Sequence, residues 1–88
     1  LDLEGCALGP QGAAALAAWP GLAGLEALSL EDNDIGPVGA RALARADLRR
    51  LRRLDLAGNG IGDEGLAALL AGSLRNLEWL ALHANGLG

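Results

Sequence analysis

A repeat of 26 residues is the feature that most constrains how this chain can fold. The segment LEALSLEDNDIG (25–36) recurs as LRRLDLAGNGIG (51–62) and again within NLEWLALHANGLG (76–88). The opening LDLEGCALG (1–9) aligns with a step of 27 residues. Fixed spacing of this kind indicates stacked units that bury a continuous core between neighbours. The alignment divides the chain into units 1–27, 28–53, 54–79 and a partial unit 80–88.

Within each unit the pattern changes from that of a strand to that of a helix. Alternating leucines in LxL predict a short strand with its leucines on one face. The segments GPQG, GPVG and GDEG predict helix starts, with Pro10 and Pro37 in a first turn and Asp63 as a candidate N-cap. Alanine-rich runs follow each start and favour helix, and Gly and Ala between helices permit close stacking. We therefore expect four strands and three helices.

One polar column lies among these apolar positions. Asn33, Asn59 and Asn85 occupy the same place after each strand, and Cys6 takes it in the first unit. A buried Asn amide both donates and accepts, so it can satisfy backbone groups of neighbouring units. Its replacement by Ala is expected to strand those groups at about 1–3 kcal/mol each. Cys6 is predicted to act as a small buried group with a weak S–H donor.

Together these motifs resemble the leucine-rich repeat. The pattern LxxLxLxxNxIG, followed by GxxG(A/L)xxL, runs through the whole chain and is most similar to the ribonuclease-inhibitor type. The 26-residue period and Cys6 are also similar to the cysteine-containing repeats of F-box substrate receptors. The resemblance implies an α/β solenoid shaped as a horseshoe arc, with parallel β-strands on the concave face and helices on the convex face.

Composition and chain ends narrow the class further. Apolar residues make up 51% of the chain, too many for a disordered acidic tail. A single Cys excludes an internal disulfide, and with a single His it cannot form a usual zinc site. The sequence has neither an initiating Met nor a signal-peptide pattern, and no capping unit covers Leu80, Leu82 and Leu87. We expect an internal fragment of a longer solenoid and a cytoplasmic location.

The candidate binding site is the outward side of the strands, where side chains are predicted to be free of packing. The residues of this site are Ser29, Glu31, Asp32, Arg53, Asp55, Trp79 and His83. Exposed Trp is enriched at binding hot spots, so Trp79 is its main candidate. The alternative is ordinary solvated surface, with Trp79 covering the last coil or packing on Arg53 by a cation–π contact. Trp19 is predicted to plug a loop.

Charge is uneven along the chain, whose net charge is −4. Six arginines fall in residues 41–53, which invites comparison with nucleic-acid-binding proteins. Arg52, however, aligns between Glu26 and Glu78, and paired charges on adjacent strands attract each other. Arg41 and Arg45 are expected on the convex helices. With no interleaved aromatic residues and a negative net charge, we expect no nucleic-acid partner and no membrane partner.

Catalysis has little support in the sequence. His83 is the one general-base candidate near neutral pH, and Ser29 is expected two strands away from it. Neither a phosphate-binding loop nor a calcium-loop spacing is present, and no cofactor or metal is expected.

The function predicted is recognition of a protein partner through the concave face, without enzymatic activity. The acidic columns suit a basic partner. One alternative is a regulatory or substrate-recognition segment of a larger multidomain enzyme or switch, such as a ubiquitin-ligase receptor or a nucleotide-binding sensor. The resemblance also permits a GTPase-activating role, for which the sequence identifies no catalytic surface. The sequence leaves the oligomeric state open.

Overall fold

Short strands and helices alternate along the chain in the computed structural model, which describes residues 1–87. The three strands are parallel neighbours in the order β1-β2-β3, and each step of 26 residues brings Ala27 beside Arg53 and Arg53 beside Trp79. The elements are α1 (Gly9–Ala17), the 3-10 helix η1 (Pro20–Gly24), β1 (Ala27–Ser29), α2 (Gly36–Ala44), β2 (Arg53–Asp55), α3 (Gly62–Leu70) and β3 (Trp79–Ala81).

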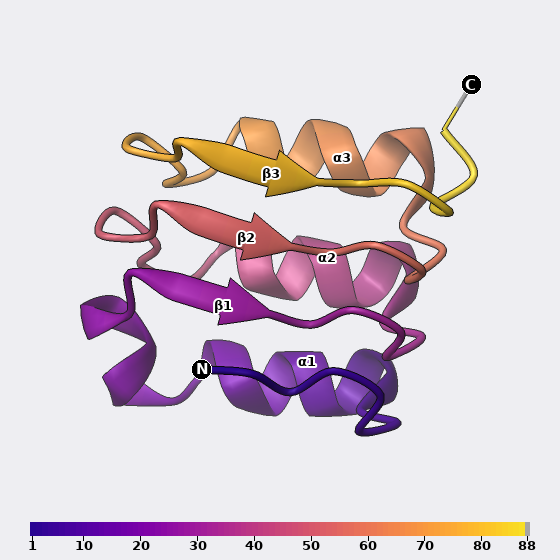
Figure 1. Cartoon of the computed structure of the whole chain (residues 1–88), viewed down its shortest axis with the longest axis horizontal. Coiled ribbons are helices and arrows are strands. Elements are labelled where there is room, and N and C mark those ends of the chain that lie inside the picture. The colour runs from indigo at the N-terminus through magenta and orange to yellow at the C-terminus, as the bar shows by residue number, and fades with distance from the viewer. Residues whose placement is uncertain (88) are drawn as a thin grey trace.

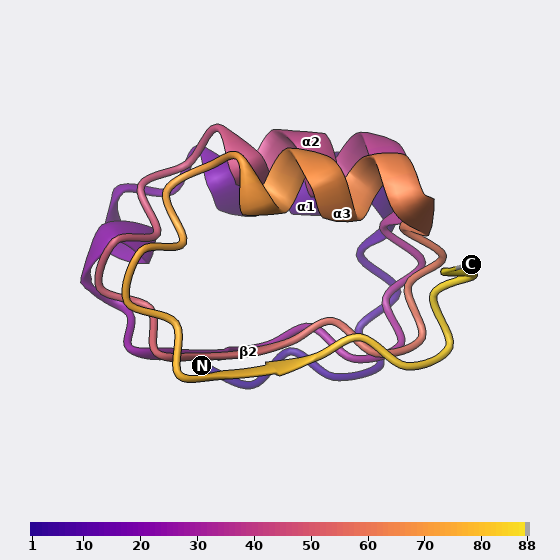
Figure 2. The same cartoon turned by 90° about the horizontal axis from the view of Figure 1, so that it is seen from above.

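The sheet and the helices form two layers on opposite sides of a flattened coil. Figure 1 shows the strands side by side in front of the helices, and Figure 2 shows successive turns of the chain stacked one behind the other. The inward-facing residues Leu28, Leu30, Leu54 and Leu56 are buried between the layers. The predicted fold class, a solenoid of parallel strands and helices, is confirmed.

Small residues set the spacing between the helices. A Cβ added at Gly39 would lie 2.7 Å from the Cβ of Ile35 and 3.1 Å from the Cβ of Ala13 on α1. Gly65 faces Ala40 on α2 in the same way, with the corresponding Cβ distance 3.1 Å. Because real Cβ atoms rarely approach so closely, these glycines allow the tight helix stacking predicted from the sequence.

The Asn column forms a hydrogen-bonded ladder that runs across the repeats. The Oδ1 atom of Asn59 accepts from the backbone N–H groups of Asn33 (3.0 Å) and Ile35 (3.4 Å). Its Nδ2 atom donates to the carbonyl oxygens of Leu30 at 2.8 Å and Leu56 at 3.0 Å. Asn85 repeats this arrangement one turn further, and all three Asn residues are buried. The ladder therefore ties each strand end to the next coil.

The start of α3 is held by a backbone carbonyl of the next coil and not by the predicted side-chain cap. Asp63 lies in the first turn of α3, whereas the N-cap position is Ile61, which makes no side-chain cap. The prediction of Asp63 as N-cap was therefore wrong. The backbone N–H of Gly62 donates to the carbonyl of Asn85 at 3.0 Å, so the next coil supplies an acceptor at the helix start. Its φ of +66° favours glycine at this turn.

The first unit departs from the prediction in two ways. Residues 1–5 form hydrogen bonds with β1 but only one isolated bridge, Asp2 with Ser29, so three strands form instead of four. Cys6 is exposed rather than buried, because a ladder side chain reaches toward the preceding coil and the described chain places none there. Its thiol donates to the carbonyl of Glu4 at 3.7 Å, and its N–H donates to Oδ1 of Asn33.

The last strand is less buried than the others. Leu80 and Leu82 are partly buried, and Leu87 is 37% exposed. Gly88, the final glycine of the aligned column, lies outside the described residues. None of the helices in residues 1–87 is long and apolar enough to cross a membrane.

Candidate functional site

The strand face, which we define as the outward side of β1–β3 and of the residues that follow each strand, contains every candidate binding residue. Arg53 and Trp79 are the first residues of the neighbouring strands β2 and β3. The guanidinium carbon of Arg53 lies 4.7 Å from the ring centroid of Trp79. This is the cation–π contact anticipated from the alignment, and an exposed contact of this type stabilises by about 0.5–1 kcal/mol. Trp79 remains 42% exposed, so much of its ring is available to a partner.

Two residues further along, Asp2 and Asp55 flank Ser29 across the strands, and both accept hydrogen bonds from backbone N–H groups. Asp55 is half-buried, and its Oδ1 atom accepts from the N–H of Ala57 at 3.0 Å. Asp2 accepts from Glu4 N–H in the same way. Asp55 therefore supports the backbone just beyond β2 as well as facing outward, a hydrogen bond that the expected freedom from packing did not predict.

Beyond the strand ends lies a group of like charges. The neighbouring carboxylate of Glu4 raises the pKa of Glu31, as do desolvation and the charges of Asp55 and Asp32, and His83 opposes them. The carboxylates around Glu31 disfavour its ionised form, so a positive charge placed beside it would be stabilised.

Asp32 extends this group toward the next repeat. Its backbone φ is +58°, and its carboxylate lies where a Cβ at Gly58 would stand. A side chain at position 58 would therefore displace that carboxylate.

A shallow depression joins the first two positions of the strand face. Ser29 lies in it between the two acidic side chains of its column, and Arg53 and Trp79 form its other end. The residues that line it are Leu1, Asp2, Ala27, Leu28, Ser29, Arg53, Asp55 and Trp79. Ser29 and His83 are associated with β1 and β3, which lie on opposite sides of β2, so they are not brought together.

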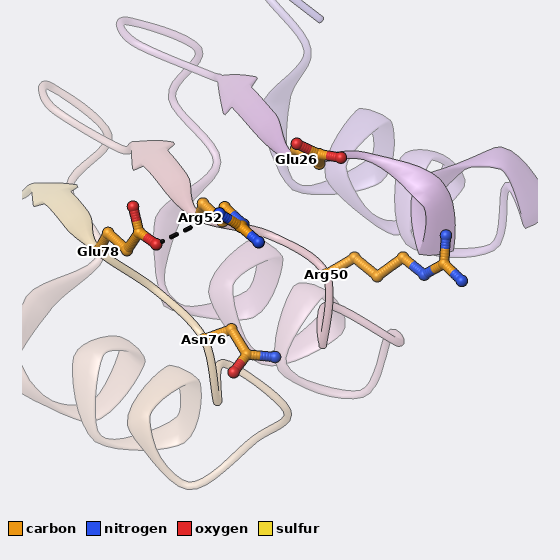
Figure 3. Close-up of a pocket in the computed structure, with 5 residues that line it drawn as sticks. All are labelled: Glu26, Arg50, Arg52, Asn76 and Glu78. Atoms are coloured by element: carbon orange, nitrogen blue, oxygen red, sulfur yellow. Dashed lines mark ion pairs between the residues drawn. The ribbon is translucent and has the colours of Figure 1, made fainter.

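Ahead of the strands the chain forms a strand-start edge, which we define as residues 26, 47–53 and 75–78. Figure 3 shows Arg52 pairing with Glu78, their charged atoms 3.5 Å apart, with Glu26 lining the same hollow. The alignment predicted Arg52 between these two acids.

Two contacts at this edge were missed by the sequence reasoning. Asp47 and Arg49 form two hydrogen bonds of 3.0 Å, which lower the pKa of Asp47 to about 2. The Nδ2 atom of Asn76 donates to the carbonyl of Arg49 at 2.7 Å, joining adjacent repeats. The i, i+2 spacing of Asp47 and Arg49 was the available signal for the first contact.

The helix side carries the remaining arginines. Arg41 on α2 lies 3.9 Å from Glu64 on α3, and both side chains are exposed. Arg45 is exposed at the end of α2, as expected. Trp19 is 46% exposed, and its ring lies over Gly21, where an added Cβ would collide with it.

Comparison with known families identifies the repeat. A family model described as Leucine Rich repeat matches residues 1–17, 25–44 and 48–70. This match covers more than half of the chain, which therefore belongs to the leucine-rich repeat family. Searches of curated proteins and of solved structures gave no match.

Proposed function

We propose that the chain is a non-catalytic protein-recognition segment that binds its partner through the strand face. The observation that carries the proposal is Trp79, a large aromatic side chain left 42% exposed on the sheet and stacked on Arg53. Repeats of this family commonly act as protein-interaction modules, and exposed Trp and Arg are enriched among residues that dominate binding. We also assign the repeat to the ribonuclease-inhibitor-like subclass, supported by Asn at three of the four ladder positions.

The chemistry of the face favours a basic protein partner. Glu4, Glu31 and Asp32 gather beyond the strand ends, and the raised pKa of Glu31 reflects their mutual repulsion. Lysine or arginine side chains of a partner would relieve this repulsion and be steered toward the face by its field. Catalysis is not part of the proposal, because Ser29 and the one candidate general base, His83, are separated by β2.

The test compares two tryptophans of similar exposure. Trp79→Ala is expected to reduce recovery of the partner in pull-downs with the protein while leaving the melting temperature nearly unchanged. Trp19→Ala is the matched control, since Trp19 is 46% exposed but lies outside the strand face. Asp55→Asn serves better than Asp55→Ala as a second variant, because Asn keeps an oxygen that can accept the Ala57 N–H. Equal effects of Trp79→Ala and Trp19→Ala on binding would refute the proposal.

A further inference from the structure

Charge in this molecule is divided along the direction of the strands. The strand-start edge carries five arginines, Arg53 included, against the carboxylates of Glu26, Asp47 and Glu78, a net charge of +2. The strand-end part of the strand face carries six carboxylates and no arginine; they are Asp2, Glu4, Glu31, Asp32, Asp34 and Asp55. The charged residues on the helix side cancel. A partner that crosses the strand face therefore meets opposite charges at its two ends.

Arg50 is the arginine of this edge best placed to receive a partner. Arg49 is held by Asp47 and Arg52 by Glu78, whereas Arg50 makes no ion pair within residues 1–87. Figure 3 shows its side chain extended away from the Arg52–Glu78 pair. Two adjacent hollows share Arg50 and Asn76 as lining residues.

The backbone beside Arg50 is fixed across the repeats. The side-chain amide of Asn76 donates to the carbonyl of Arg49, the preceding residue, at 2.7 Å. The planar guanidinium of an arginine such as Arg50 can donate two parallel hydrogen bonds to one carboxylate.

We propose that the strand-start edge is a second contact point, where Arg50 receives a carboxylate of the same partner that lays its basic side chains over the strand-end acids. The inference rests on the proposed function and adds the direction in which the partner lies, with its acidic group at the strand starts and its basic groups at the strand ends. Glu26 and Glu78 flank the hollow and limit its positive charge, which suits a single carboxylate better than a polyanion. A polyanion long enough to span the face would also meet the six carboxylates.

The repeat register gives the spacing that such a partner needs. Arg50 aligns with Gly24, seven positions before Glu31. At a strand rise of roughly 3.3 Å per residue this is at most about 23 Å, since only residues 27–29 of this stretch form β1. An extended partner segment would thus place its acidic and basic groups about seven residues apart.

Two fluorescein-labelled peptides test the inference by anisotropy at low ionic strength. EEEGSGSKKK carries an acidic and a basic block at this spacing, and QQQGSGSKKK keeps only the basic block. Arg50→Gln is expected to weaken binding of the first peptide by up to about fivefold, the range of one exposed ion pair. It should leave binding of the second unchanged or slightly tighter. Arg45→Gln, which removes an exposed arginine on the helix side, is the control and should alter neither affinity.

The outcomes separate this inference from the proposed function. Loss of affinity for EEEGSGSKKK alone on Arg50→Gln supports the second contact point. Equal changes for both peptides, or no binding of EEEGSGSKKK, would overturn it. Binding of EEEGSGSKKK that weakens with Glu31→Gln but is unchanged by Arg50→Gln would leave the basic-partner proposal standing without the second contact.

Discussion

Replacement of Asn59 by Ala tests how far the Asn ladder holds the stack together. The change removes Oδ1, which accepts the N–H groups of Asn33 and Ile35, and Nδ2, which donates to Leu30 O and Leu56 O. Two buried N–H donors lose this acceptor, and each stranded group costs about 1–3 kcal/mol. We therefore expect Asn59→Ala to reduce the free energy of unfolding by about 2–6 kcal/mol. The whole stability of a chain of this length is about 4–13 kcal/mol.

The assay is urea unfolding followed by circular dichroism, with stability obtained by linear extrapolation. Asn76→Ala is the matched control, because Asn76 is exposed and makes its hydrogen bond to Arg49 O at the surface. Its loss is expected to be about 0.5–1.5 kcal/mol at most. If the two variants lost the same stability, or if Asn59→Ala lost less than about 1 kcal/mol, the ladder would not be the support described above.

Two further predictions concern helix stacking and the acidic group. Gly39→Ala is expected to lower the free energy of unfolding by about 1 kcal/mol or more, because the new Cβ would crowd Ile35 and Ala13. Gly24→Ala is the control, because Gly24 has open space around it and its replacement should not lower stability. Equal urea midpoints for the two variants would contradict this prediction. Glu4→Gln is expected to lower the pKa of Glu31 in carboxyl-carbon NMR titrations, since Glu4 is the largest cause of its rise. Because the folded pKa of Glu31 is raised above its ordinary value, this carboxyl favours the folded chain at low pH, and that contribution is lost as the pH rises through the folded pKa. An unchanged Glu31 pKa in Glu4→Gln would show that the two acids do not interact.

Much of the fold could be predicted because the repeat register assigns every residue to a column. Leu28, Leu54 and Leu80 pair in the predicted register, and the buried Asn residues follow at the strand ends. The column of a residue fixes its place within its own repeat, so the environment of one aligned residue predicts that of the others. The errors fall where a residue depends on a neighbouring coil. Cys6 shares the Asn column but is exposed, because exposure depends on the coil stacked against it.

The site was less predictable, for two physical reasons. A residue's column does not reveal its hydrogen bonds, so the alignment did not predict that Asp55 accepts the Ala57 N–H. Counting charge along the chain also hid its arrangement in space. The arginine run and the acids before it lie in different repeats, and their order along the chain does not show that they occupy opposite ends of the strands. The alignment columns already held that signal for Arg50 and Glu31.

Site-specific photocrosslinking tests most directly the central claim, that the strand face binds the partner. A photoreactive amino acid would replace Ala27, exposed on the strand face, or Ala67, exposed on α3, in otherwise identical proteins. If the strand face binds the partner, position 27 gives a crosslinked protein adduct and position 67 gives none. A crosslink from position 27 to another part of the same chain would instead support the alternative of a regulatory segment. Adducts from position 67 alone would show that the partner binds the helix side and not the strand face.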